Sequence, residues 1–309
     1  MQCLRPIAAG YDQQTGAFSL SHKHLKSLEH IKIPCRKCIS CRLNTAREKA
    51  VRCIHESQFA EDSIFLTLTY DEENVTERLD YTHFQKFIRK IRDNSIKDVS
   101  YVVTGEYGEQ TKRPHWHAII FDYYPSDPVK KYQTDAGDQV FESEEIDKIW
   151  DMGITEFGSV SIDSAGYVCR YAAKKLVHGK DQEHDYHPIH NTSKKYPIGK
   201  RWIEKYCDHT FQNGFIVLPN GKESCIPRYY KDWCKKENPD LYKHYQEKVL
   251  PKIKDKMEAI QRKEELEWHS LNYSRIDQDW SGPRLKPRNT VRETVLKSKF
   301  KKLQENLKL

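Results

Sequence analysis

Residues 98–123 read DVSYVVTGEYGEQTKRPHWHAIIFDY and contain two β-rich runs, 98–106 and 115–123, separated by eight residues rich in turn formers. This separation predicts an antiparallel hairpin with a longer loop. Side chains alternate between the two faces of a strand, so His115 and His117 are expected on one face and Trp116 on the other. The hairpin therefore brings two imidazoles together.

A carboxylate is expected beside these two histidines. Glu106 ends the first strand of the hairpin, and a connection of eight residues would place it roughly opposite His115. Two imidazoles and one carboxylate form a ligand set for divalent metals, and three protein ligands leave positions open for water and a phosphate oxygen. The sequence thus predicts a metal site at Glu106, His115 and His117 that suits phosphodiester cleavage.

The elements around the hairpin indicate the fold class. Strands are also predicted at 63–70 and 154–160, and helices at 40–59, 79–91, 142–150 and 163–177. From residue 63 the order is β, α, β, β, α, β, α. This order predicts an α+β fold: a split βαβ antiparallel sheet, ferredoxin-like or RRM-like, with helices on one face and helical N- and C-terminal appendages.

The chain is expected to have four parts. These are a cysteine-containing segment and helix (1–60), a core (61–178), an accessory region of loops with one hairpin (179–234) and a polar helical tail (235–309). Residues 281–309 carry nine Lys or Arg and two Glu, an excess of seven that equals the net charge of the whole chain, +7. Such a tail suits a polyanion such as DNA, although a solvated charged helix face explains it equally well.

A second candidate group lies in SAGYVCRYAAKKLV, residues 164–177. Tyr167, Tyr171 and Lys175 are spaced four apart, so they project from one face of a helix, with Lys174 beside them. A phenol with a pKa near 10 is a poor nucleophile at neutral pH, but a metal can polarise the phosphate and an ammonium can stabilise developing negative charge. The alternative is a pair of half-buried tyrosines that pack on the sheet.

Three runs in order carry a family resemblance: FLTLTY (65–70), GEYGEQTKRPHWHAIIF (105–121) and YVCRYAAKK (167–175). They resemble the motifs of HUH endonucleases, in particular the replication initiators of microviruses and most closely their gokushovirus branch. The resemblance covers about residues 35–178. It implies that His115 and His117 bind a divalent metal, Mg or Mn. It also implies that Thr67 and Thr69 lie in the strand of the first motif, and that Tyr167 and Tyr171 are paired nucleophiles.

The resemblance also implies a reaction cycle and partners. One tyrosine would nick single-stranded DNA at a viral origin, form a 5′-phosphotyrosine and free a 3′-OH for the host DNA polymerase. The second would cut the regenerated origin so that the circle can close. No G-x-x-x-x-G-K-[ST] loop occurs in the sequence, so a host helicase is an expected partner.

The expected location is the cytoplasm of a bacterial host, with no membrane partner. The sequence has no run of about 18 apolar residues, and its N-terminus lacks the pattern of a signal peptide. Nine cysteines in such a chain are expected to be reduced rather than paired in disulfides.

Cys35, Cys38 and Cys41 form C-x2-C-x2-C, a spacing that can supply three thiolates to a structural zinc ion. Cys3 and Cys53 are candidates for a fourth ligand. Three reduced thiols at the start of a helix fit the same spacing, so both interpretations remain open.

Other functional interpretations also remain open. A zinc hydrolase would use only Glu106, His115 and His117 and would leave the tyrosines without a role. A non-catalytic single-stranded nucleic-acid-binding protein of the RRM type would stack bases on aromatic side chains and need no metal. A plasmid-type or transposon-type HUH nickase would more usually have a single catalytic tyrosine. The aromatic and basic runs 201–206 and 227–233 fit base stacking and ordinary packing equally well.

Overall fold

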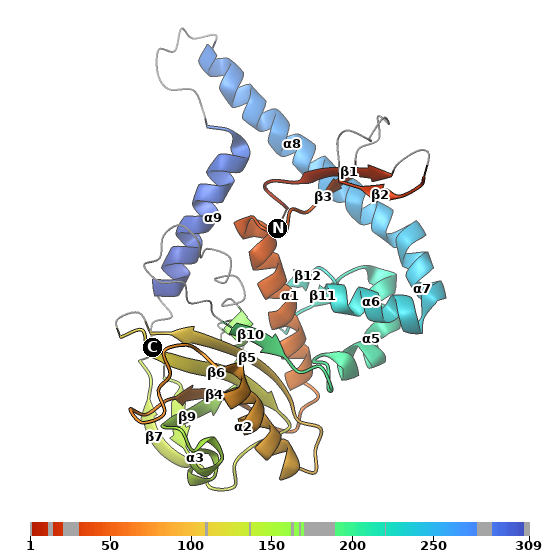
Figure 1. The fold of residues 1–309 in the computed structure, drawn as a ribbon. Coiled ribbons are helices and arrows are strands. Elements are labelled where there is room, and N and C mark those ends of the chain that lie inside the picture. Colours follow the sequence, from red (N-terminus) through yellow and green to blue (C-terminus); the bar gives the residue numbers. More distant parts are fainter. Residues whose placement is uncertain are drawn as a thin grey trace. The chain divides into compact units, whose positions relative to one another are not determined.

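The computed structural model describes residues 2–11, 15–20, 31–108, 111–135, 137–161, 164–166, 168–169, 189–219, 221–276 and 286–305. The chain divides into two compact units, one formed by residues 1–44 and 252–308 and the other by residues 45–251. Figure 1 shows their elements. None of the helices in these ranges carries an apolar stretch of the length needed to cross a bilayer.

The strands are β1 (Ile7–Tyr11), β2 (Phe18–Ser19), β3 (Ile31–Ile33), β4 (Ser63–Thr69), β5 (Ser100–Tyr107), β6 (Pro114–Phe121), β7 (Val129–Gln133), β8 (Gln139–Glu142), β9 (Thr155–Ser159), β10 (Ile189–Thr192), β11 (Ile216–Val217) and β12 (Glu223–Ser224). The helices are α1 (Ile39–Ser57), α2 (Tyr81–Asp93), α3 (Glu144–Trp150), α5 (Lys200–Asn213), α6 (Arg228–Glu237), α7 (Pro239–His244), the π-helical η1 (Tyr245–Val249), α8 (Leu250–Ile276) and α9 (Arg288–Glu305).

A seven-stranded sheet forms the centre of the unit made by residues 45–251. Its strand order is β10-β5-β6-β4-β9-β8-β7, and every neighbouring pair is antiparallel. The predicted hairpin is β5 and β6, which pair from Ser100 opposite Phe121 to Tyr107 opposite Pro114. The predicted α+β fold with an antiparallel sheet is therefore confirmed.

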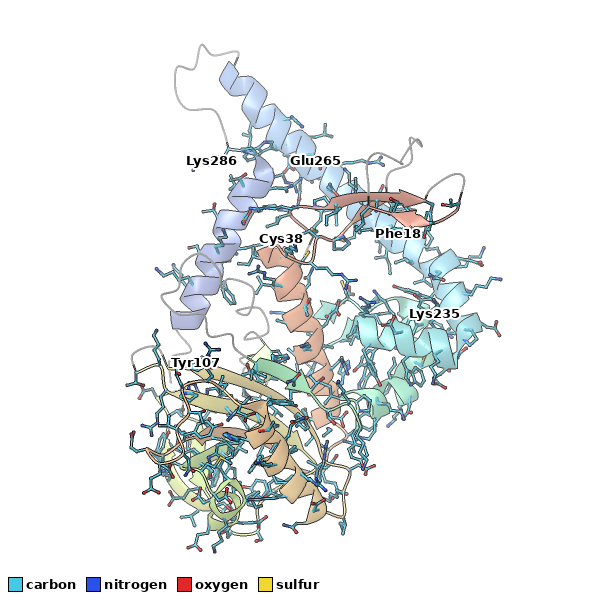
Figure 2. The ribbon with its side chains drawn as sticks, in the orientation of Figure 1. Phe18, Cys38, Tyr107, Lys235, Glu265 and Lys286 are labelled. Atoms are coloured by element: carbon cyan, nitrogen blue, oxygen red, sulfur yellow. The ribbon has the colours of Figure 1, made fainter. Side chains whose placement is uncertain are left out.

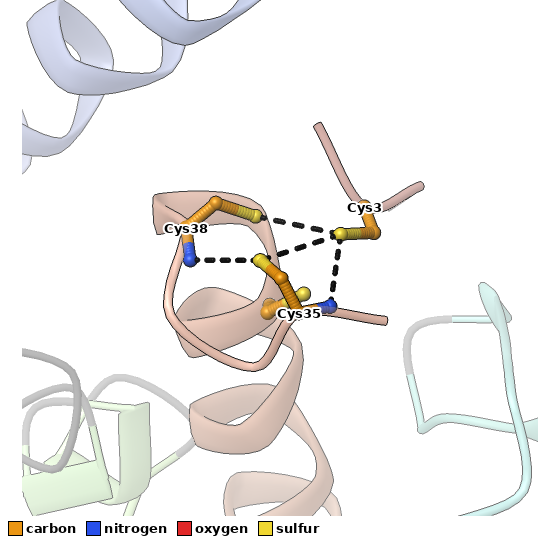
Figure 3. Close-up of side chains that lie close together, drawn as sticks. Cys3, Cys35 and Cys38 are labelled. Atoms are coloured by element: carbon orange, nitrogen blue, oxygen red, sulfur yellow. Dashed lines mark hydrogen bonds between the residues drawn. The ribbon is translucent and has the colours of Figure 1, made fainter. Parts of the chain in front are cut away.

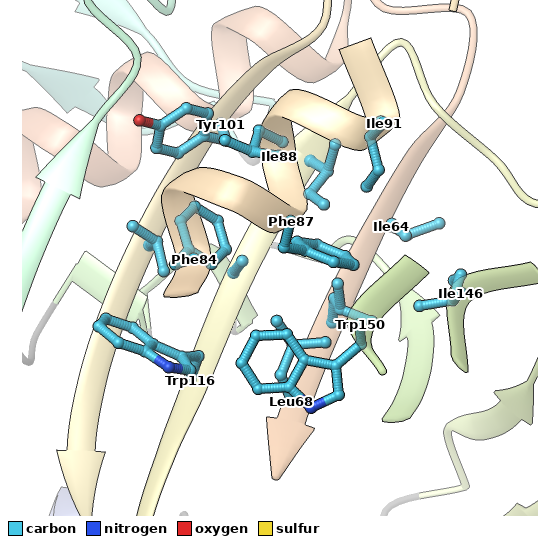
Figure 4. Close-up of a cluster of buried hydrophobic side chains, with 14 of the residues drawn as sticks. Ile64, Leu68, Phe84, Phe87, Ile88, Ile91, Tyr101, Trp116, Ile146 and Trp150 are labelled. Carbon is cyan, nitrogen blue, oxygen red and sulfur yellow. The ribbon is translucent and has the colours of Figure 1, made fainter. Parts of the chain in front are cut away.

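One face of this sheet is packed against α2 and α3. Along β4 the residues Ile64, Leu66 and Leu68 are buried on this face. Asp80 caps α2 by accepting a hydrogen bond from the backbone N–H of Thr82 (2.8 Å). The helix then buries a stripe at the helical period, which Figure 4 shows against the strands: Phe84, Phe87, Ile88 and Ile91.

Trp116 of β6 is buried in this packed face next to Phe84, with ring centroids 5.8 Å apart (Figure 4). Its indole N–H donates a hydrogen bond to the Tyr70 hydroxyl (2.8 Å), so the buried polar group is satisfied. Directly across the hairpin is Gly105, where an added Cβ would lie 2.5 Å from the Trp116 ring. The hairpin needs glycine at this position because any side chain would displace the tryptophan.

The opposite face of the sheet also receives helical residues, which the sequence pattern did not predict. Val102, Ile119 and Phe121 form a buried cluster there with Cys53 of α1 and with the 164–169 segment. In that segment, residues 164–166 and 168–169 are helical where the structure describes them. The C-terminal part of α1 therefore contributes to the core of the sheet.

Apart from β1 to β3, the sequence analysis did not predict β7, β8, β10, α5 or α6. β7, β8 and β10 are short and carry many polar residues, and β7 and β10 lie at the two edges of the sheet, where no apolar face has to be buried. α5 lies in a region that was expected to be loops and a hairpin. Its buried residues do follow the helical period, at Trp202, Ile203, Cys207, Thr210 and Phe211, so a signal was present in the sequence.

The aromatic runs at 201–206 and 227–233 contribute mainly to a second core. His55 stacks on the Trp202 ring (centroids 3.7 Å apart) and its Nδ1 lies 2.9 Å from the Tyr230 hydroxyl. Burial lowers the pKa of His55 to about 3, so this histidine is neutral. Trp202 and Tyr230 are buried, and they are therefore packing residues rather than platforms for bases.

Candidate metal centre and active site

Three adjacent strands carry the candidate metal ligands and the residues around them. The register pairs Glu106 of β5 with His115 of β6, which is the position that the hairpin length predicts. On the other side of β6, Thr67 of β4 pairs with His117. Residues that pair directly share a face, and this face is opposite to the one that holds Trp116.

The side chains converge on one carboxylate oxygen. Oε1 of Glu106 lies 3.2 Å from Nε2 of His115 and 3.2 Å from Nε2 of His117. Two donor atoms that each lie about 2.1 Å from one metal ion, at an angle between about 90° and 109°, are about 3.0 to 3.4 Å apart. The spacing of this group therefore fits ligands around one ion, and its ligand atoms all lie within 4.8 Å of one another.

A backbone carbonyl determines the protonation of His115. Its Nδ1 lies 3.2 Å from the Arg113 carbonyl oxygen, which can only accept a hydrogen bond, so Nδ1 carries the proton and donates it. In the tautomer that carries its proton on Nδ1, the Nε2 lone pair points at a carboxylate oxygen of Glu106. Two electron-rich atoms at this distance repel each other unless a second proton or a metal ion lies between them. The donor set therefore fits a bound cation.

The histidines are also held by contacts from neighbouring strands. Nδ1 of His117 lies 3.0 Å from the Thr67 hydroxyl, and the ring stacks on Phe65 with centroids 5.8 Å apart. The guanidinium of Arg113 donates to the Tyr70 carbonyl (3.0 Å), which anchors the residue that bonds His115. These outer contacts orient both imidazoles before any ion binds.

The three candidate ligands differ in their exposure to solvent. The side chains of Glu106 and His117 are 11% and 8% exposed, whereas that of His115 is 20% exposed. Tyr107, the next residue of β5 (Figure 2), accepts a hydrogen bond from the Leu79 backbone N–H (2.7 Å) and so fixes the end of the strand. A ligand would therefore approach from the side of His115.

The predicted catalytic residues Tyr167, Tyr171, Lys174 and Lys175 lie outside the described residues. Their described neighbours Ala165, Val168 and Cys169 are fully buried. These three pack with Val102 and Ile119, which are on the same face of the sheet as the histidines. The described residues Ala165, Val168 and Cys169 therefore pack on the sheet face that carries the candidate metal group.

The cysteines form a second candidate metal group, in the unit that contains residues 1–44. The thiols of Cys3, Cys35, Cys38 and Cys41 lie within 4.8 Å of one another. Cys53 is not part of this group, because its Sγ lies 3.8 Å from that of Cys169 in the buried core. Of the two candidates for a fourth thiol, the structure brings only Cys3 to the other three. The described cysteines are free thiols in this structure.

Comparisons with known proteins identify the family. A family model for replication-associated proteins of the ORF2 type matches residues 63–176, a range that includes both the metal group and the two tyrosines. The chain is 50% identical to replication-associated protein VP4 of Bdellovibrio phage phiMH2K, with both chains covered in full. The chain therefore belongs to the family of microvirus-type replication initiators.

More distant relatives carry similar descriptions. The chain is 30% identical to replication-associated protein ORF4 of Chlamydia phage 1, over 71% of this chain and 57% of that protein. It is 26% identical to replication-associated protein ORF2 of Spiroplasma virus 4, over 94% of this chain and 96% of that one. No solved structure matches the chain.

Proposed function

We propose that this chain is a metal-dependent endonuclease that nicks single-stranded viral DNA at its origin and becomes covalently joined to the new 5′ end through a tyrosine. The observation that carries the proposal is the Glu106, His115 and His117 group on the sheet face where the 164–169 segment packs. In this proposal Tyr167 and Tyr171, whose sequence neighbours Ala165, Val168 and Cys169 pack on this face, act on the phosphate that the metal group binds.

Glu106, His115 and His117 would hold a divalent ion such as Mg or Mn, which when bound supplies a Lewis acid for a phosphate oxygen. The protein residues contribute orientation. Arg113 keeps the proton on Nδ1 of His115, and Thr67 lies where it can accept the Nδ1 proton of His117. Both Nε2 atoms can then bind a cation.

The tyrosine step balances without another reactant. The phenol of Tyr167 or Tyr171 loses its proton and its oxygen attacks phosphorus. The bond from phosphorus to the 3′ oxygen breaks, and that oxygen takes up a proton to become a 3′-OH. Lys174 and Lys175, close to both tyrosines in sequence, would stabilise the negative charge that develops. A second tyrosine allows the same exchange at the regenerated origin, while the free 3′-OH displaces the first.

The proposed partners follow from this product. A 3′-OH on a nicked circle is a primer for the host DNA polymerase, and a host helicase would separate the strands. These steps would take place in the cytoplasm of the bacterial host.

A covalent adduct tests this function. The full chain is incubated with end-labelled fragments and intact circles of the single-stranded genome of its own virus, with Mg²⁺ or Mn²⁺. We expect nicked DNA and a labelled protein–DNA species that survives denaturant, and neither on an unrelated circle of the same length. Cleavage without an adduct would instead indicate a hydrolase. Binding without cleavage and without need of metal would indicate a nucleic-acid-binding platform.

Thr67→Val tests the role of the contact from β4. Valine keeps the shape of threonine but cannot bond Nδ1 of His117, so the imidazole loses its orientation and the affinity for Mn²⁺ should fall by about 10- to 100-fold. Thr69→Val is the matched control, because Thr69 lies opposite His115 on the same strand and face and its hydroxyl bonds no described residue. Metal titration by calorimetry measures both. Equal affinities in the two variants would remove Thr67 from the site.

A further inference from the structure

Four thiols from two separate segments meet at the beginning of α1 (Figure 3). Cys3 comes from the segment before β1, Cys35 and Cys38 precede α1, and Cys41 lies in the first turn of the helix. We infer that Cys3, Cys35, Cys38 and Cys41, the cysteine cluster, bind one structural zinc ion that ties the N-terminal segment to α1 and α9. This site is separate from the Glu106 group and does not depend on the nicking function.

The distances between sulfur atoms support a tetrahedral site. Sγ of Cys3 lies 3.5 Å from that of Cys35 and 3.9 Å from that of Cys38. Four sulfurs that each lie about 2.3 Å from a tetrahedral zinc ion are about 3.8 Å apart. These separations are well above the bonded distance of about 2.05 Å in a disulfide. The thiols are therefore spaced as ligands around an ion.

Backbone and charge complement the anionic form of the cluster. The N–H of Cys35 donates to Sγ of Cys3 (3.3 Å), and the N–H of Cys38 donates to Sγ of Cys35 (3.3 Å), as Figure 3 shows. Two guanidinium groups, those of Arg5 and Arg42, interact electrostatically with the cluster. Zinc coordinates thiolates, so binding releases protons and leaves a net negative charge that these donors and cations stabilise.

The N-terminal segment and α9 contact each other at the cysteine cluster. Next to Cys3, the Leu4 side chain is buried with the cysteines, and Leu296 of α9 packs on the same group. Asn289 of α9 donates to the Leu4 carbonyl (3.2 Å), and Arg5 pairs with Glu293 (2.7 Å). Binding of zinc would therefore stabilise the position of residues 289–296 of α9 as well as that of the N-terminal segment.

The lysines of this helix remain exposed, at Lys297, Lys299, Lys301 and Lys302. A helix that is fixed at one end and cationic along its exposed surface suits contact with phosphates. The ion would thus position a basic element without touching DNA itself.

Metal content tests the site directly. Because zinc can also occupy the histidine group, the chain carrying His115→Ala with His117→Ala is purified without added metal and analysed for zinc. We expect about one equivalent, released by a mercurial thiol reagent, since structural zinc in such sites is tightly bound. Less than about a tenth of an equivalent, with no uptake from a stoichiometric zinc solution, would overturn the inference.

Two cysteine substitutions in the same background identify the ligands. Cys35→Ser should lose the zinc, and Cys225→Ser, a change at an exposed thiol outside the cluster, should keep it. Replacement of zinc by Co²⁺ reports the number of thiolates bound to the ion, so it distinguishes the loss of one ligand from the loss of the whole site. The chain that carries only the two histidine substitutions should show the intense visible absorption of a tetrahedral cobalt tetrathiolate. Adding Cys3→Ser should change this spectrum to that of a three-thiolate site. An unchanged spectrum in Cys3→Ser would exclude Cys3 as the fourth ligand.

Amide hydrogen exchange measures the tie to α9. Removal of zinc by a chelator should speed exchange in residues 288–296 by at least about tenfold, because the helix loses its anchor, while β6 stays protected. Equal exchange rates in α9 before and after removal would show that the ion does not hold this helix.

Discussion

Replacing His115 and His117 together by alanine is expected to abolish DNA cleavage and divalent-metal binding at the Glu106 group. A bound metal contributes several kcal/mol to stabilising charge in the transition state of phosphoryl transfer, so the rate should fall by at least about a thousandfold. The sheet should remain folded, since the apolar packing of β6 is made by Trp116 and Ala118 on its other face. Nicking of origin DNA and Mn²⁺ titration measure the two losses.

His209→Ala with His244→Ala is the matched control, because it removes two exposed histidines that are distant in sequence from the metal group. It should leave nicking unchanged. Excess chelator should reproduce the loss in the unmodified chain, and added Mg²⁺ or Mn²⁺ should restore activity. Full nicking by the His115 and His117 double variant, or in the presence of chelator, would rule out this metal site.

Replacing both Tyr167 and Tyr171 by phenylalanine is expected to eliminate the covalent adduct. Phenylalanine keeps the ring and removes only the nucleophilic oxygen, so the loss should be complete while folding is retained. Each single variant should still form an adduct, since the remaining tyrosine lies one helical turn away in the predicted helix. Circle formation should fall far more than first nicking in both single variants, because the second exchange lacks its nucleophile.

Tyr124→Phe serves as a control for the loss of an exposed phenol elsewhere in the same unit. Adducts on an origin oligonucleotide and closed circles on genomic DNA are counted separately. A single variant with both normal nicking and normal circularisation would show that its tyrosine is a packing residue, and the alternating scheme would be wrong.

The central strands and α2 could be predicted from the sequence because burial restricts which residues can occupy their positions. The strands β4, β5 and β6 must bury one or both faces, and α2 must present Phe84, Phe87, Ile88 and Ile91 to them, so period and composition identify these elements. The length of the connection also predicted the pairing of Glu106 with His115, since the two strands are adjacent in sequence and burial of one face restricts their register.

Other features depend on contacts that no local pattern encodes. Thr67 meets His117 only because β4 pairs with β6 rather than with its neighbour in sequence. Cys3 is 32 residues from Cys35, so spacing could suggest three thiols but could not choose the fourth. The edge strands β7 and β10 have few apolar residues, so they lack the alternation of apolar and polar residues by which a strand is predicted.

β6 is hydrogen-bonded on both sides, by β5 and by β4, and both histidines lie within it. Fluctuations of a loop can open a site that is built on that loop. The ligands of this metal group, in contrast, lie on β5 and β6, and they move apart only when these two strands separate. Separating the metal ligands therefore requires breaking backbone hydrogen bonds of the sheet, which costs more free energy than the fluctuation of a loop. The nicking activity proposed above would hold a DNA end while an entire circle is copied, and it would need a site that persists for that time.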